Sequence, residues 1–276
     1  MSKEPVAKMQ QDDYLSPINN FVDKGDLIIN IQPLRDKMQE VGADPNISVY
    51  FEFLNTGANI AVNKDTEFWP ASLMKIPIAM AVMKKIEEGE WKMSNELIML
   101  EEDKDSHFGN LYKSPANSRF TIEKLLDEML IESDNTARTI FMRNLEKSDI
   151  EEVLNHLGIE DIFNTEQQVS TKKYSIFWRA LYTSSYLSPE HSNQLIKIMA
   201  KSVSSEYLAS GLPGETVFSH KIGVIYDSKI YADSGIVYLS KRPYILTVMV
   251  SGKDKEAAEK IMSDISKTVY EYIASY

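Results

Sequence analysis

The sequence predicts an α+β fold: an antiparallel sheet of about five strands built from both ends of the chain, with an all-helical lobe inserted between its second and third strands. Three observations predict it. Apolar residues alternate in a strand pattern near residue 50, helical periodicity runs from about 72 to 205, and strand patterns return after Pro213. Helices at the two ends of the chain would cover the sheet. A cleft between two such lobes is a natural ligand site.

The domain limits follow from the same patterns. Residues 1–25 are polar and aperiodic, which indicates an N-terminal arm. Residues 26–276 are expected to form a single domain. Within it, 26–70 and 212–276 would supply the α/β lobe, and 71–211 the helical lobe.

The N-terminal elements are a short helix at about 31–41, ended by Gly42, and a strand at 47–54 in which Ile, Val and Phe alternate with Ser, Tyr and Glu. The turn Asn55-Thr56-Gly57 leads to a second strand at 60–62, as in a hairpin. The helical lobe is predicted to contain helices at 72–88, 121–131, 134–145, 149–157, 172–184 and 188–201.

The C-terminal part predicts three consecutive strands, at 217–225, 229–239 and 244–251. An amphipathic helix then opens at Asp254 and continues to the end of the chain.

Composition excludes several classes of function. The chain has 276 residues, a net charge of −11 and no dense basic cluster, so a nucleic-acid partner is not expected. No run of 18 apolar residues exists, which predicts no membrane span. The absence of cysteine excludes disulfides and thiolate zinc sites, and the four histidines lack metal-ligand spacing, so no cofactor is expected.

The first chemical signal is Ser72-Leu-Met-Lys75, at the front of the apolar segment IPIAMAVM. Residues three apart share a helix face, so the lysine amine would reach the serine hydroxyl. A lysine acts as the base for a serine nucleophile only when its pKa is lowered, and burial in this segment would lower it. The same S-x-x-K pattern recurs at Ser170–Lys173 before a polar stretch, where we interpret the serine as a helix cap.

Two further signals are weak when taken alone. Ser133-Asp134-Asn135 lies between two predicted helices and is also what a helix N-cap requires. Lys221-Ile222-Gly223 lies on a predicted strand, where the lysine is compatible with a solvated edge and the glycine lets a ligand approach the backbone.

The three motifs lie in this order on a predicted helix, an inter-helix loop and a strand. This arrangement resembles that of the penicillin-recognising serine hydrolases, which include class A β-lactamases and the related D-alanyl-D-alanine peptidases. The segments ESDNTA, ASGLPGETVFSHKIG and ADSGIVYL are similar to that family as well, and the resemblance covers roughly residues 30–275.

The resemblance implies a role for each matched residue. Ser72 would be the nucleophile that forms an acyl-enzyme, and Lys75 its base. Ser133 would carry a proton to the leaving nitrogen. Asn135 would bind the substrate amide, and Lys221 would orient Ser133 and bind the substrate carboxylate. The backbone N–H groups of Ser72 and of Val224, after Gly223, would form the oxyanion hole, and Tyr112 would lie at the cleft rim.

The first departure from the family concerns the groups that would bind the substrate carboxylate. Ile222 stands where the family has a hydroxyl that contacts the substrate carboxylate, and Ser234 stands where class A enzymes carry an arginine. We considered Lys229, Arg138 and His220 as substitutes, or no substitute at all.

The second departure concerns the loop that supplies the deacylating glutamate in class A enzymes. Here Glu166-Gln-Gln-Val-Ser170 matches that motif only in part, and Glu166 is interpreted either as this residue or as an exposed loop glutamate. The expected function is therefore a serine hydrolase acylated by β-lactams or D-alanyl peptides, with weak deacylation.

The alternatives are a D,D-peptidase-like cell-wall enzyme and a non-hydrolysing penicillin-binding or sensor module. The protein is expected to be a monomer. The family implies a periplasmic or extracellular location, although the sequence starts without an export signal, so a cytoplasmic location stays open.

Overall fold

A five-stranded antiparallel sheet forms the centre of the molecule in the computed structural model, which describes residues 30–160, 162 and 166–275. The expected arm, residues 1–25, lies outside the described residues. The strand order is β2-β1-β9-β8-β7, so both ends of the chain contribute and the predicted fold class is confirmed. The strands are β1 (Ile47–Phe53), β2 (Ala58–Val62), β7 (Val217–Ile225), β8 (Ile230–Tyr238) and β9 (Tyr244–Ser251).

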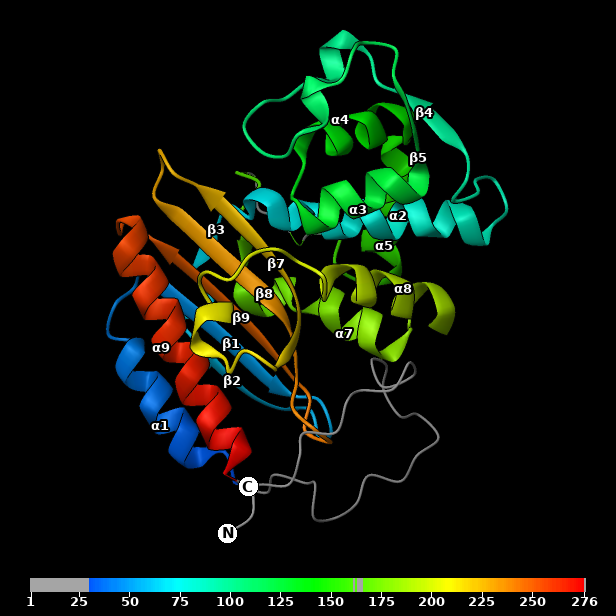
Figure 1. Cartoon of the computed structure of the whole chain (residues 1–276). Coiled ribbons are helices and arrows are strands. Elements are labelled where there is room, and N and C mark those ends of the chain that lie inside the picture. Colours follow the sequence, from blue (N-terminus) through cyan, green and yellow to red (C-terminus); the bar gives the residue numbers. More distant parts are fainter. Residues whose placement is uncertain (1–29, 161, 163–165, 276) are drawn as a thin grey trace.

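Helices cover both faces of this sheet (Figure 1). On one face α1 (Gln32–Val41) and α9 (Lys255–Ala274) lie side by side, and Asp254 caps α9 by accepting a hydrogen bond from the Ala257 N–H at 2.8 Å. On the other side lies the helical lobe: α2 (Lys75–Glu87), α3 (Ile122–Ile131), α4 (Asn135–Asn144), α5 (Lys147–His156), α6 (Thr171–Tyr174), α7 (Ile176–Thr183) and α8 (Pro189–Met199).

Two hydrophobic cores hold these layers together. One lies between the sheet and the pair α1–α9, and the other fills the helical lobe around α2, in which every residue from Lys75 to Met83 is buried. The apolar segment that the sequence places behind Ser72 is therefore the central helix of its lobe. Its burial makes it a rigid support for the residues at its N-terminus.

Strand β1 is buried along its whole length, although its sequence alternates between apolar and polar residues. Its polar side chains face the helical lobe and pair with it. Ser48 Oγ lies 2.8 Å from Thr171 Oγ1, and Glu52 accepts hydrogen bonds from the Arg179 guanidinium. The strand is thus paired rather than solvated on its polar face, as buried polar groups require.

The predicted helix at 172–184 is two helices, α6 and α7, which meet at Ser175. The Ser175 hydroxyl donates to the Thr171 carbonyl at 2.8 Å and lies 2.7 Å from Thr247 Oγ1 on β9. Four short strands were also missed: β3 (Glu67–Phe68) pairs with β6 (Val169–Ser170), and β4 (Glu96–Ile98) with β5 (Arg119–Thr121). Strands of two or three residues are too short to show a period.

Candidate active site

Ser72 and Lys75 lie at the point where two kinds of helix join. Ser72 belongs to the 3₁₀ turn η2 (Ala71–Met74), and Lys75 is the first residue of α2. Side chains three residues apart eclipse one another in a 3₁₀ turn. The Lys75 Nζ accordingly lies 3.1 Å from Ser72 Oγ. The contact that the sequence spacing predicted is present.

The amine of Lys75 is buried and has three further partners. Its Nζ lies 2.5 Å from the Ser133 carbonyl oxygen, 3.2 Å from Ser133 Oγ and 2.7 Å from Asn135 Oδ1. These residues are about 60 positions away in sequence, in the loop between α3 and α4 and at the start of α4. The fold therefore brings the first two motifs together around one nitrogen atom.

Burial lowers the pKa of Lys75 from its ordinary value of 10.5 to about 6, and the positive charges of Lys221 and Arg138 add to this effect. Lys221 is itself almost fully buried. Burial lowers its pKa to about 8, against the opposing influence of the Asp233 carboxylate. The pKa of Lys75 is thus lowered further than that of Lys221, so Lys75 loses its proton at a lower pH than Lys221 does.

Ser133 has a left-handed backbone, with φ of +57°, which is unusual for a residue with a side chain. It directs both its carbonyl and its hydroxyl toward Lys75. The next residue, Asp134, is the N-cap of α4 and accepts a hydrogen bond from the Ala137 N–H at 2.8 Å. The cap interpretation of this tripeptide and the functional one thus apply to different residues: Asp134 caps the helix, while Ser133 and Asn135 face Lys75.

Gly223 lies on β7 where this edge strand passes the segment before Ser72. A Cβ atom at Gly223 would come within 2.5 Å of the Pro70 carbonyl oxygen. Only glycine allows this close approach, and it brings the backbone at Val224 beside the turn that carries Ser72.

Ile222 and Ser234, where the sequence differs from the family pattern, contact other parts of the fold. Ile222 packs against the core between the sheet and α9. The Ser234 hydroxyl lies 2.6 Å from Thr247 Oγ1. His220 is buried, with its Nδ1 2.9 Å from the Asp233 carboxylate, and therefore is a poor replacement for the missing arginine. Arg138 is exposed on α4, and its positive charge contributes to the lowered pKa of Lys75.

Lys229, the third substitute considered, is exposed in the turn that joins β7 to β8, where its φ is +50°. Glu166 is exposed as well, in the loop before β6, in contrast to the buried lysines. Tyr112 lies in the 3₁₀ turn η4 (Leu111–Lys113), and the Lys113 amine is 5.6 Å from the centre of its ring.

Phe108 was not singled out from the sequence, although its carbonyl accepts a hydrogen bond from the Asn135 N–H at 3.0 Å. Its ring stacks on that of Tyr226, just beyond β7, with the ring centres 6.3 Å apart. The available signal was a single aromatic residue in the polar run from Asp105 to Asn110.

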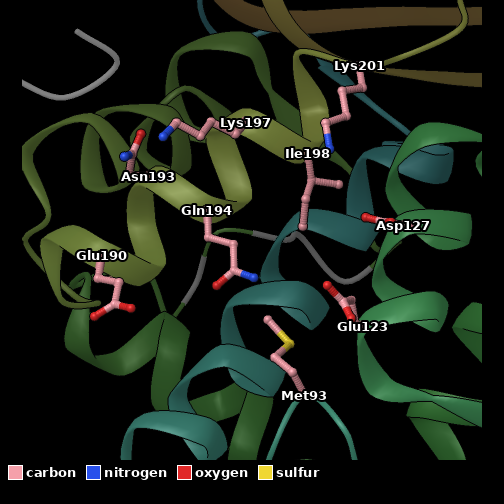
Figure 2. Close-up of a pocket in the computed structure, with 9 residues that line it drawn as sticks. All are labelled: Met93, Glu123, Asp127, Glu190, Asn193, Gln194, Lys197, Ile198 and Lys201. Atoms are coloured by element: carbon pink, nitrogen blue, oxygen red, sulfur yellow. The ribbon is translucent and has the colours of Figure 1, made fainter. Parts of the chain in front are cut away.

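A cavity of about 480 Å³ lies apart from this cluster, between α3 and α8 (Figure 2). Carboxylates and lysines line it together, including Asp127 and Lys201. None of the residues around Ser72 contributes to it. Within the described part of the chain, no three His, Asp or Glu side chains are placed to hold a metal ion, and no helix is long and apolar enough to span a bilayer.

Comparisons with known proteins agree with this geometry. The model of the β-lactamase enzyme family matches residues 33–273. β-Lactamase VEB-1 of Pseudomonas aeruginosa is 26% identical over 245 residues, which cover 79% of this chain and 82% of that protein.

Solved structures share the fold. A structure of PBP-A has a TM-score of 0.81 at 24% identity and covers 89% of this chain and 97% of its own. The extended-spectrum β-lactamase TLA-3 has a TM-score of 0.81 at 19% identity, with 88% and 99% covered. A PBP-A mutant with the same fold was solved as an acyl-enzyme complex with penicillin G. Since the family model spans most of the chain, the protein belongs to the β-lactamase enzyme family and is a β-lactamase-like serine hydrolase.

Proposed function

We propose that Ser72 is acylated by β-lactams and that the resulting acyl-enzyme is released slowly. The observation that carries this proposal is the contact of 3.1 Å between Ser72 Oγ and the buried amine of Lys75, whose pKa is lowered to about 6. A neutral amine at this distance is a general base for the hydroxyl.

In the proposed reaction, the residues around Ser72 act one after another. Lys75 takes the proton of Ser72 Oγ as this oxygen attacks the lactam carbonyl carbon. The N–H groups of Ser72 and Val224 stabilise the oxyanion, to which each such donor contributes about 2.7–4 kcal/mol in comparable sites. When the C–N bond breaks, Ser133 passes a proton to the leaving nitrogen and is itself resupplied from Lys75, 3.2 Å away. Asn135 binds the acyl amide, and the charge of Lys221 attracts the substrate carboxylate.

Slow release is proposed because Glu166, which the family resemblance assigns to activating the deacylating water, stands in a motif that matches the family only in part and is exposed in the loop before β6. An ester of Ser72 hydrolyses slowly unless a base is positioned for the attacking water. The second candidate function follows from the same feature. A D,D-peptidase-like enzyme of the cell wall would be acylated at Ser72 by D-alanyl peptides, and its function would not depend on rapid hydrolysis of a β-lactam-derived ester. In the extreme case, the protein would be a sensor module whose Ser72 is acylated and whose acyl group is never released.

Intact mass spectrometry with benzylpenicillin tests these functions together, with turnover followed in parallel. We expect a covalent adduct of the full mass of the antibiotic that persists in the wild type and is absent in Ser72→Ala. Fast turnover without an accumulated adduct would contradict slow release, and no adduct and no turnover would contradict acylation itself.

Members of this family are typically secreted or periplasmic. We propose the same location for this protein, because β-lactams and D-alanyl peptides are encountered there. Fractionation of the native host with an antibody against the chain tests this; recovery from the cytoplasmic fraction alone would contradict it.

A further inference from the structure

Pro77 lies in the first turn of α2, four residues after Leu73. In a continuous α-helix the carbonyl of Leu73 would accept a hydrogen bond from the N–H of residue 77. Proline has no N–H, and its ring collides with the carbonyl four residues before it. The α-helix accordingly begins only at Lys75, and the residues before it form the separate 3₁₀ turn that carries Ser72. The Leu73 carbonyl is thus left without its ordinary α-helical donor.

A tyrosine from a distant part of the chain supplies a donor instead. The Tyr174 hydroxyl donates to the Leu73 carbonyl oxygen at 2.8 Å, and both residues are fully buried. The Lys75 N–H is shared between the carbonyls of Ser72 and Leu73, so it does not fully replace the missing donor. Burial also raises the pKa of Tyr174 well above its ordinary value of 10.0, so the hydroxyl keeps its proton and remains a donor.

Both ends of this hydrogen bond are themselves held in place. Tyr174 is the last residue of α6, and its ring stands edge-on to that of Phe177 with the centres 5.4 Å apart. At the other end, a Cβ atom at Gly223 would come within 3.2 Å of the Leu73 side chain, so Leu73 lies beside β7. The residue that follows Ser72 is therefore fixed to α6 through its carbonyl and packed beside β7 through its side chain.

We propose that Tyr174 is a positioning residue for Ser72. Its hydroxyl replaces the helix hydrogen bond that Pro77 removes, and so fixes the turn in which Ser72 Oγ lies 3.1 Å from the Lys75 amine. The proposal rests on acylation at Ser72. Without the hydroxyl, the peptide unit after Leu73 is free to rotate, and fewer molecules hold the nucleophile and its base at reacting distance.

The size of the expected effect is set by one neutral hydrogen bond. Loss of such a bond changes a rate that depends on it by roughly three- to tenfold. The effect should fall on the acylation rate at saturating substrate rather than on substrate binding, because the fully buried side chain of Tyr174 does not touch a bound substrate.

Rapid-quench mass spectrometry with benzylpenicillin at increasing concentrations measures the acylation rate at saturation and the concentration that gives half of it. Tyr174→Phe removes only the hydroxyl. A double variant adds Pro77→Ala, which returns an N–H four residues after Leu73. Tyr244→Phe is the matched control, because this tyrosine on β9 is also fully buried and its hydroxyl has no hydrogen-bond partner in the described part of the chain. Thermal unfolding checks that each variant folds.

We expect Tyr174→Phe to lower the acylation rate at saturation roughly three- to tenfold and to leave the half-saturating concentration within about twofold of the wild type. Adding Pro77→Ala should restore the rate to within about twofold, since the helix then supplies the donor itself. Tyr244→Phe should change neither quantity. The rescue is specific, because an N–H at position 77 cannot repair a loss of packing at position 174.

An unchanged rate at saturation in Tyr174→Phe would overturn the positioning role alone, and so would an equal loss in Tyr244→Phe. A loss that Pro77→Ala does not reverse would overturn it as well, because the Leu73 carbonyl would then not be what the hydroxyl acts on. If Tyr174→Phe does not fold by itself, the double variant decides: a rate near that of the wild type supports the proposal, and a loss of about threefold or more contradicts it.

The wild type separates this proposal from the one on which it rests. A wild type that forms no adduct with benzylpenicillin would overturn acylation at Ser72, and the positioning role of Tyr174 with it.

Discussion

The chain contains the pattern S-x-x-K twice in comparable positions, and the two copies behave differently. Ser72–Lys75 and Ser170–Lys173 both lie at the start of a helix. In the first, the lysine amine reaches the serine hydroxyl at 3.1 Å. In the second, the serine hydroxyl accepts a hydrogen bond from the lysine's backbone N–H, and the amine turns outward to Glu67 at 3.4 Å.

The difference lies in burial rather than in spacing. Lys75 is fully buried, whereas the Lys173 side chain is 47% exposed and paired with a carboxylate. Water and an opposite charge both favour a charged amine, and burial beside another cation disfavours it. The same four-residue pattern thus produces a buried amine beside a serine hydroxyl in one place and a helix cap in the other. Four predictions test this comparison, from the largest expected effect to the smallest.

The largest effect is expected on acylation. Lys75→Met should slow acylation by benzylpenicillin by about 10³-fold, because a general base contributes 10²–10⁴-fold in rate. Lys173→Met should leave the rate unchanged, since its amine does not face Ser170. Stopped-flow rates for both variants measure this, and equal rates in the two would contradict the distinction.

The second effect is on pH dependence. Acylation requires Lys75 to be neutral, so its second-order rate should fall about tenfold per pH unit below the pKa of about 6. It should also fall above the pKa of Lys221, about 8, where that residue loses its charge. Lys221→Arg should remove the alkaline decline, because a guanidinium stays charged. A rate independent of pH between about 5 and 7 would contradict the role of Lys75.

The third effect is on stability. Lys75→Met should raise the free energy of unfolding by about 1–4 kcal/mol at neutral pH, since a well-packed apolar residue would replace a buried amine. The folded-state pKa is lowered from 10.5 to about 6, so the unfolded state binds more protons between these values and the penalty shrinks as pH rises. Denaturant unfolding should therefore show a larger gain at pH near 6 than near 9. Lys173→Met, which changes an exposed side chain, should have little effect at either pH.

The smallest effect concerns the cap. Ser170→Ala should lower the free energy of unfolding by about 1 kcal/mol, the usual contribution of a serine N-cap. Acylation should be unaffected. A loss of acylation in Ser170→Ala, with the fold intact, would mean that the second copy also takes part in the chemistry.

Much of this fold could be predicted because apolar residues recur at regular intervals along the long helices and strands. The strands at 217–225 and 244–251 have the predicted limits, and Thr121 and Asp254 begin helices as expected. The short strands and the break at Ser175 could not be predicted. They depend on contacts with distant residues, such as Thr247, that leave no local pattern.

The sequence by itself determined which residues could react: a serine and a lysine three apart, a Ser-Asp-Asn loop and a lysine before a glycine. The tertiary structure decided which of them lie together, because it buried Lys75, placed Ser133 and Asn135 beside its amine and brought Lys221 near it. It also decided that Ile222 and Ser234 contact other residues and that the Phe108 ring stacks on that of Tyr226. The physical reason is that spacing sets which side chains are neighbours along a helix. The pKa of an amine depends on the water and charges around it, and residues far away in the sequence supply these.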